Sequence, residues 1–265
     1  MDEPIAEKAD VIKQAKSFGA AGWTKFVDFL TPPLCLSCQA PITSGSSLCL
    51  GCWQKLNFID EPVCDVLGTP FAYDEGEGAV SPAAMADPPS WDKARAAVVF
   101  DDASAHLVHM LKYNDRQEAG LAMARMMLGA GRNLLINTDV ILPVPLHRQR
   151  LWRRRFNQAA YLCERVSRTS GIAWAHDVLL RVEATPSQVG LDAKERHKNV
   201  RRAFEVPPEK RPMIEGKSVL LVDDVRTTGA TANVCAETLK IAGAAHVHLL
   251  TFALVLEPAR LHIEA

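Results

Sequence analysis

The sequence lacks the features that would direct it into a membrane or into the secretory pathway. No apolar run approaches the roughly 18 residues that a transmembrane helix needs. Acidic residues such as Asp2, Glu3 and Glu7 stand where a signal peptide would have a basic start and an apolar core. We therefore expect a cytoplasmic protein without membrane insertion. Its seven cysteines should stay reduced there, so they require an explanation other than disulfides.

An excess of charge of one sign is also lacking. The chain has 30 Lys and Arg against 31 Asp and Glu, for a net charge of −1, which gives no whole-protein attraction to nucleic acid. Any phosphate binding must then come from local clusters. With 48% hydrophobic and 23% charged residues, the composition is that of a globular protein and excludes disordered and fibrous classes. A length of 265 residues favours two folded units.

The pattern along the chain changes at three places. We expect a helical segment at 1–30, a zinc-binding module at 31–66, a Gly- and Pro-rich linker at 67–93, and an α/β domain at 94–265. In the last unit, short apolar runs alternate with helical segments, which is typical of a parallel α/β sheet. Its expected strands are 96–100, 140–144, 219–222 and 247–254, and its expected helices are 105–113, 118–128, 157–167 and 230–242, the last ended by Gly243.

Four cysteines form two C-x2-C pairs separated by a short loop. They are Cys35, Cys38, Cys49 and Cys52. Such pairs offer four thiolates to one tetrahedral ion, with no open position for a substrate. The spacing predicts a structural Zn²⁺ that holds a module too small to stabilise itself. An iron–sulfur cluster and redox-active thiols are the alternatives.

The other three cysteines fit no second metal site. Cys64 stands apart, and Leu67 occupies the place where a further C-x2-C pair would have its second cysteine. We interpret Cys64 as a buried thiol, with a fallback role as a ligand. Cys163 and Cys235 fall on expected helices and are interpreted as core residues.

The segment 219–231 carries the most chemical information. Four apolar residues predict a buried strand, and Asp223 and Asp224 follow at its carboxyl end, where parallel sheets bind ligands. The next residues are rich in threonine and lead into a helix, so hydroxyls, backbone N–H groups and the helix dipole converge on one anion. The carboxylates can accept hydrogen bonds from neighbouring sugar hydroxyls. The segment therefore indicates a sugar phosphate, the alternative being an ordinary capped strand-to-helix turn.

This segment resembles the phosphoribosyl pyrophosphate (PRPP) fingerprint of type I phosphoribosyltransferases. The resemblance implies that fold and a PRPP site made by Asp223, Asp224, Arg226, Thr227, Thr228, Gly229, Ala230 and Thr231, with Mg²⁺ bound alongside PRPP. The carboxylates would bind the ribose hydroxyls, and residues 227–231 would bind the 5′-phosphate. The loop after the strand at 140–144 matches the family's pyrophosphate site, which implies roles for Pro145, Leu146, His147 and Arg148. A stretch from Arg181 to Phe204 resembles the loop that closes over PRPP. The resemblance implies four catalytic residues, which are Gln188 and Arg196 in this stretch together with Asp223 and Asp224.

Together with the cysteine pairs, three further motifs resemble the ComF family of competence-associated proteins. They are His109-x-Leu111-Lys112-Tyr113, Pro143-x-Pro145 and Arg154-Arg155-Phe156-Asn157-Gln158. The resemblance links the chain to DNA uptake in natural transformation and leaves two interpretations. The chain is either a phosphoribosyltransferase or a non-catalytic nucleotide sensor or scaffold that binds competence proteins or single-stranded DNA, with Arg153, Arg154 and Arg155 as DNA-binding residues.

Overall fold

The computed structural model describes residues 33–43, 48–113, 117–146, 157–182 and 203–256. The helical segment expected at 1–30 lies outside these residues. The described chain begins with a small module containing helix α2 (Leu50–Trp53), continues through helix α3 (Pro82–Ala86), and then enters an α/β domain. In these parts of the chain, no helix is both long and apolar enough to cross a membrane.

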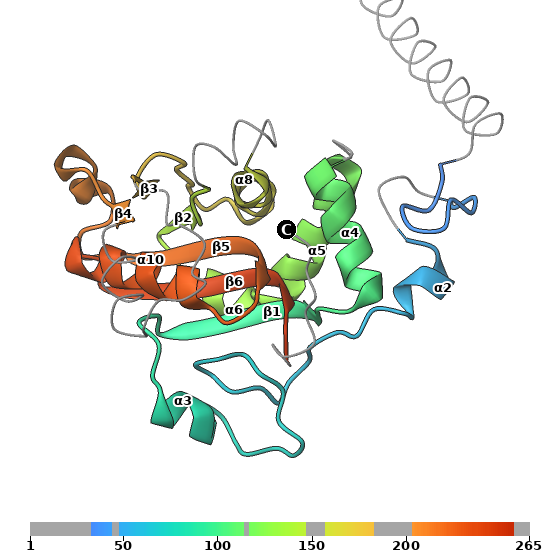
Figure 1. The fold of residues 1–265 in the computed structure, drawn as a ribbon, viewed down its shortest axis with the longest axis horizontal. Coiled ribbons are helices and arrows are strands. Elements are labelled where there is room, and N and C mark those ends of the chain that lie inside the picture. The colour runs from blue at the N-terminus through green and yellow to red at the C-terminus, as the bar shows by residue number, and fades with distance from the viewer. Residues whose placement is uncertain (1–32, 44–47, 114–116, 147–156, 183–202, 257–265) are drawn as a thin grey trace, which may run out of the picture.

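Four parallel strands form the central sheet of the α/β domain (Figure 1). Their order in space is β1 (Lys93–Val99), β6 (His246–Leu254), β5 (Ser218–Arg226) and β2 (Val140–Pro143). The apolar run at 219–222 is completely buried, as expected of a central strand covered on both faces. The predicted parallel α/β sheet is thus confirmed. Strand β5 runs beyond the expected end, because Asp223 still pairs with Thr251 and Arg226 still pairs with Leu254.

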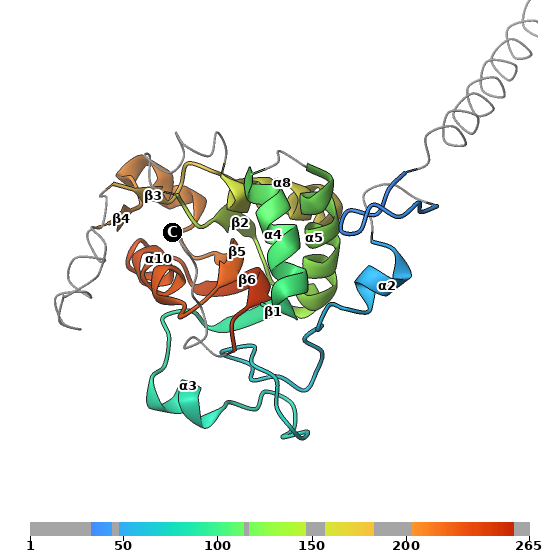
Figure 2. The ribbon, with the colours of Figure 1, turned by 45° about the vertical axis from the view of Figure 1, so that its right-hand side comes forward.

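Helices cover both faces of this sheet (Figure 2). Helices α4 (Asp102–Tyr113), α5 (Gln117–Ala130) and α8 (Gln158–Ser170) lie over one face, and α10 (Ala230–Ile241) lies over the other. Leu220 and Val222 of β5 belong to the core under the first three helices, and Val219 and Leu221 belong to the core under α10. Cys163 on α8 and Cys235 on α10 are completely buried in these two cores, as predicted from the sequence.

The remaining elements of the domain are short. Helix α6 (Arg132–Leu135) precedes β2, and a two-stranded antiparallel sheet pairs β3 (Leu180–Arg181) with β4 (Phe204–Glu205). A 3₁₀ helix, η1 (Pro208–Met213), then leads toward β5. Helix α8 begins at Asn157, whose side chain accepts a hydrogen bond from the Ala159 N–H, and it ends at Gly171 in the left-handed conformation.

The N-terminal module packs directly on the α/β domain. Leu36 and Leu56 join the same hydrophobic core as Leu107 of α4, and Phe58 forms an antiparallel bridge with Val98 of β1. The segment 67–93, predicted to be a linker, holds the short helix α3 and ends at the first residue of β1. At its end, however, Trp91 is 5% exposed and lies in the core under α10. The module and the domain are therefore joined through buried side chains.

Candidate functional site

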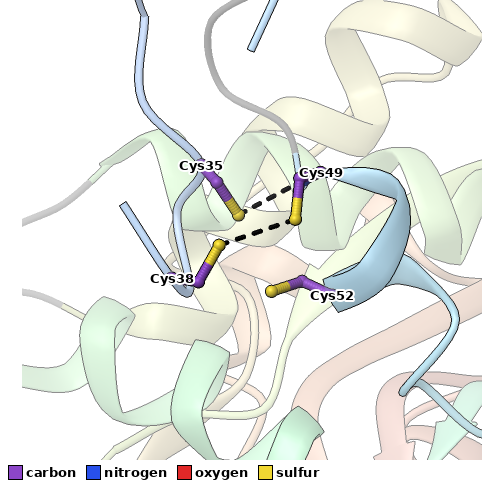
Figure 3. Close-up of side chains that lie close together, drawn as sticks. All are labelled: Cys35, Cys38, Cys49 and Cys52. Atoms are coloured by element: carbon purple, nitrogen blue, oxygen red, sulfur yellow. Dashed lines mark hydrogen bonds between the residues drawn. The ribbon is translucent and has the colours of Figure 1, made fainter. Parts of the chain in front are cut away.

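The four cysteines of the two C-x2-C pairs converge on one point (Figure 3). All four Sγ atoms lie within 4.8 Å of one another, and those of Cys38 and Cys49 are 3.5 Å apart. A zinc ion with four bonds of about 2.3 Å would hold its sulfurs about 3.8 Å apart, so the cluster already has the size of a zinc site. Four thiols also complete a tetrahedral shell and leave no position for a substrate. The cluster is consistent with a structural zinc.

The backbone around the cluster favours thiolates. Burial alone would raise the pKa of the Cys35 thiol, but N–H groups of Cys38 and Cys49 point at its sulfur and lower the pKa to about 6. The Cys49 N–H lies 3.2 Å from that sulfur. Burial raises the pKa of Cys52 to about 11 when no ion is present. A bound cation would stabilise all four thiolates, so metal binding should release protons.

Cys64 is separate from this cluster. It is completely buried, and its sulfur accepts hydrogen bonds from the backbone N–H groups of Leu67 at 3.4 Å and Ser81 at 3.2 Å. Burial tends to raise the pKa of this thiol, but these hydrogen bonds outweigh it and lower the pKa. Among the described residues, the only group of potential metal ligands is the four-cysteine cluster, so Cys64 stays a buried thiol here.

Two carboxylates lie at the carboxyl end of the central strand β5. The Oδ1 atom of Asp223 accepts the Asp224 N–H at 2.9 Å, and Oδ1 of Asp224 accepts the Val225 N–H at 2.8 Å. Burial raises the pKa of Asp223 well above its ordinary value, and the charge of Asp224 raises it further. The carboxyl oxygens of Asp223 and Asp224 can accept hydrogen bonds, which suits recognition of hydroxyl groups.

Lys112 at the end of helix α4 pairs with one of these carboxylates. Its Nζ atom lies 2.9 Å from Oδ2 of Asp224, and the two side chains are 22% and 14% exposed. The pair is therefore sheltered from water and joins helix α4 to the end of β5. Lys112 belongs to one of the motifs quoted above, but its partner could not be read from the sequence. No local signal connects positions 112 and 224.

The turn between β5 and α10 is open to solvent on one side. Thr227 and Thr228 are exposed, and Gly229 adopts the left-handed conformation with φ of 78° directly before α10. The N-cap residue Gly229 has no side chain to cap the first turn of α10, and the Thr228 hydroxyl accepts a hydrogen bond from the Ala230 N–H at 3.4 Å. The positive end of the helix dipole therefore meets two exposed threonine side chains, which is a suitable environment for a phosphate.

The side chain of Arg226 points away from this turn. It is 7% exposed, its guanidinium donates from Nη2 to the Leu67 carbonyl, and it lies 5.7 Å from the ring centre of Trp91. The Trp91 indole in turn donates to the Val66 carbonyl at 2.9 Å. The role of Arg226 in PRPP binding stays a prediction.

The expected pyrophosphate loop leaves the sheet beside the two carboxylates. Strand β2 pairs with β5, and the Val144 N–H donates to the Val222 carbonyl at 2.9 Å, directly before Asp223. Pro145 and Leu146 follow and are partly buried. The other predicted site residues, His147, Arg148, Arg153, Arg154, Arg155, Gln188 and Arg196, lie outside the described residues. Gln188 and Arg196 belong to the segment 183–202. The residues on either side of that segment are hydrogen-bonded, because the Val182 N–H donates to the Ala203 carbonyl at 2.8 Å.

Comparison with known proteins gives matches in both parts of the chain. Residues 26–83 match the double zinc ribbon domain family, and residues 168–262 match the phosphoribosyl transferase domain family. The "DNA utilization protein YhgH" of Escherichia coli (strain K12) is 30% identical over 226 residues, which are 82% of this chain and 95% of that protein. The chain belongs to the ComF/YhgH family.

Other ComF/YhgH relatives extend over the same region. The protein of that name in Salmonella typhimurium (strain LT2) is 32% identical with the same coverage. "Competence protein F" of Haemophilus influenzae is 29% identical over 221 residues, 81% of this chain and 94% of its own. Among solved structures, a hypoxanthine phosphoribosyl transferase of Trypanosoma cruzi aligns with 56% of this chain and 69% of its own, at 16% identity and a TM-score of 0.34. That similarity is too low to assign any residue. The ComF/YhgH family thus combines the zinc ribbon and the parallel sheet found here.

Proposed function

We propose that the chain is an enzyme that binds PRPP and transfers its phosphoribosyl group to a nitrogen nucleophile, with release of pyrophosphate. One observation carries the proposal. Asp223 and Asp224 lie near the carboxyl end of the buried central strand β5, and the strand leads into a turn with exposed threonines at the start of α10. Few ligands need both a pair of carboxylates and a phosphate-binding turn beside it. A ribose 5-phosphate needs acceptors for two hydroxyls and a positive cradle for one phosphate.

Phosphate binding in this proposal uses the turn between β5 and α10. Thr227, Thr228 and Thr231 supply hydroxyls, and Gly229 and Ala230 supply backbone N–H groups at the positive end of α10. Because Gly229 has no side chain, the backbone can approach the ligand closely there. The ribose would then extend from the turn toward the end of β5, with its hydroxyls on Asp223 and Asp224.

The reaction breaks the bond between C1′ and the pyrophosphate oxygen, which keeps the electron pair. The attacking nitrogen forms a bond to C1′ and loses a proton to water or to the released pyrophosphate. Positive charge develops on the ribose during the step, so carboxylates near the sugar would stabilise the transition state by electrostatics. Mg²⁺ bound together with PRPP would neutralise charge on the leaving group. Pro145, Leu146, His147 and Arg148 would bind pyrophosphate, while Gln188 and Arg196 would act from the segment between β3 and β4.

Calorimetry with PRPP, with and without Mg²⁺, tests this proposal. We expect tighter binding with Mg²⁺, and Thr228→Ala should weaken binding by roughly 1–3 kcal/mol, since a hydrogen bond to a charged group is lost. Thr238→Ala is a matched control, because the Thr238 hydroxyl bonds to the Val234 carbonyl within α10, away from the turn. If binding is indifferent to both Thr228→Ala and Asp224→Asn, the site assignment is wrong. Release of pyrophosphate with a panel of nitrogen nucleophiles then tests catalysis.

A second candidate function is a scaffold that binds single-stranded DNA without catalysis. The printed names of the relatives, "DNA utilization protein" and "Competence protein F", favour it. Arg148→Ala should weaken PRPP far more than a nucleoside monophosphate, which has no diphosphate to bind. A triple alanine variant of Arg153, Arg154 and Arg155 should instead weaken single-stranded DNA of any sequence and lower the salt slope by about 0.7 for each lost phosphate contact. Unchanged DNA affinity in the triple variant at low salt would contradict the scaffold.

A further inference from the structure

The second half of the matched ribbon region has no ligand set of its own. The match to a double zinc ribbon runs to residue 83, but all four clustered cysteines lie at or before Cys52. Between Cys52 and His106, the sequence has Cys64 and no other cysteine or histidine. Zinc ribbons bind their ion through cysteine and histidine side chains. The second ribbon of this chain must therefore keep its shape without zinc.

The turn at Cys64 keeps the hydrogen bonds of a metal-binding knuckle. The Leu67 and Ser81 N–H groups point at the Cys64 sulfur, and the Gly68 N–H donates to the Cys64 carbonyl at 2.7 Å. Gly68 has a φ of 63°, and a Cβ there would lie 2.5 Å from the Ala94 carbonyl oxygen. The chain thus turns tightly around one sulfur, in the manner of half a zinc site.

Two side chains from outside the ribbon bind the carbonyl groups on the outer side of this turn. The Trp91 indole N–H donates to the Val66 carbonyl, and the Arg226 guanidinium donates to the Leu67 carbonyl. Arg226 is a buried cation beside the Cys64 sulfur. Burial lowers the pKa of Arg226 to about 10, and the charge of Cys64 acts in the opposite direction. The guanidinium therefore remains charged near neutral pH.

Arg226 and Trp91 also flank the phosphate-binding turn, which is the turn between β5 and α10 that holds Thr227 and Thr228. Arg226 forms one end of this turn, and Trp91 contacts Gly229 at the other end. Arg226 stands directly before Thr227 and Thr228, and Gly229 stands directly after them. Gly229 lies against the Trp91 ring so closely that a Cβ on it would be 2.8 Å from the ring carbon Cη2. One turn further along α10, Asn233 accepts the Ser90 N–H at 2.5 Å. Both ends of the turn are therefore fixed by contacts with the ribbon side of the molecule.

We propose that the second ribbon is a metal-free clamp on the phosphate-binding turn, and that Arg226 and Trp91 are the positioning residues through which it acts. The proposal rests on the proposed function only for the identity of the ligand. Arg226 takes the structural place of a zinc ion by holding the Cys64 turn with a cation and directional hydrogen bonds. In doing so it also fixes the backbone N–H groups that would receive the 5′-phosphate. A phosphate site gains affinity when its donors are held in place before the ligand arrives.

Amide hydrogen exchange of the ligand-free, full-length protein tests the clamp directly. Arg226→Met keeps an apolar stem but removes the cation and its hydrogen bond, and we expect exchange at residues 227–232 to become about tenfold faster or more. Arg226→Lys should restore part of the protection because it keeps the charge. Trp91→Phe removes the bond to Val66 and the indole ring carbons nearest Gly229, but it leaves the bond from Arg226 to Leu67, so it should have a smaller effect in the same residues.

Arg95→Met is the matched control. Arg95 lies on β1, its side chain is 12% exposed, and it also binds this ribbon, with hydrogen bonds to the Asp65 carbonyl at 3.1 Å and to Asp65 Oδ1 at 2.9 Å, but it contacts no residue of the phosphate-binding turn in those bonds. It should loosen the ribbon and leave exchange at 227–232 unchanged. Each variant should retain about one zinc per chain, because the four-cysteine cluster is separate.

Binding of a nucleoside 5′-monophosphate provides the functional half of the test. We expect Arg226→Met to raise the Kd about tenfold or more and Arg95→Met to leave it unchanged. The clamp would be overturned if Arg226→Met and Arg95→Met changed amide exchange equally. It would also be overturned if Arg226→Met changed neither amide exchange nor the Kd. If the wild type binds no phosphate ligand, the proposed function fails, and the exchange result still decides whether the clamp exists.

Discussion

Replacing Lys112 with methionine would test whether helix α4 stabilises the carboxylates at the end of β5. The substitution keeps the apolar stem of the side chain and removes the ammonium group that lies 2.9 Å from Asp224 Oδ2. Asp224 then remains beside Asp223 without a cation. We expect loss of stability, because an uncompensated carboxylate in a sheltered position is costly.

The structure sets the size of this effect. Two unit charges about 4 Å apart interact by about 4 kcal/mol at an effective dielectric constant of about 20. Ordering of the lysine side chain and its remaining contact with water reduce this value, since 22% of Lys112 and 14% of Asp224 are exposed. We therefore expect a coupling energy of about 1–3 kcal/mol between the two residues.

Urea unfolding of Lys112→Met, Asp224→Asn and the double variant gives this coupling as a double-mutant cycle. The pair of Lys210 and Asp177 is the control, with side chains that are 29% and 45% exposed, and its coupling should be smaller because water screens it. If the Lys112 pair couples no more strongly than the control pair, then α4 does not stabilise the site and the reasoning fails.

Two further predictions concern the metal and the buried acid. Cys49→Ser should lose the zinc, which elemental analysis would show as a fall from about one ion per chain. The variant should also expose residues 33–66 to proteolysis while the α/β domain stays folded. A variant that resists proteolysis as well as the wild type does would contradict the structural metal. Asp223→Asn should gain stability relative to the wild type as the pH rises above about 4, and urea midpoints between pH 4 and 8 would show it. The pKa of Asp223 is raised in the folded state by burial and by Asp224. The contribution of Asp223 to wild-type stability is therefore fully present below its pKa in the unfolded chain, and it is lost as the pH rises through its pKa in the folded protein. Parallel curves for the two proteins would contradict this assignment.

The elements that depend on local sequence could be predicted. The run at 219–222 is apolar at every position, so it indicated a strand covered on both faces, and the structure confirms it. The two C-x2-C pairs likewise place their sulfurs by local geometry, which is why the metal cluster was expected at the right four residues. The ends of elements were predicted less well, and β5 is an example. Asp223 and Asp224 were expected to follow the strand, but pairing with β6 continues through them to Arg226.

Contacts between distant parts of the chain could not be predicted. The resemblance to phosphoribosyltransferases placed Arg226 among the PRPP-binding residues, but no local signal indicated that its side chain bonds to the carbonyl of a residue 159 positions away in the sequence. The pairing of Lys112 with Asp224 and the packing of Trp91 on Gly229 are of the same kind. Spacing and periodicity describe a single element, whereas these contacts depend on how the elements are packed together.

The position of β6 in the sheet has a consequence for folding during synthesis. Of the four strands of the described sheet, β6 is synthesised last, yet it lies between β1 and β5 and pairs with both. Strands β2 and β5 can pair earlier, but β1 has no partner strand in this sheet until His246 and the residues after it have been made. Late, long-range pairing of this sort is slow and leaves strand edges exposed in the meantime. A chain that stopped before His246 would lack the strand that joins β1 to β5, so the nine residues of β6 decide whether β1 becomes part of the sheet.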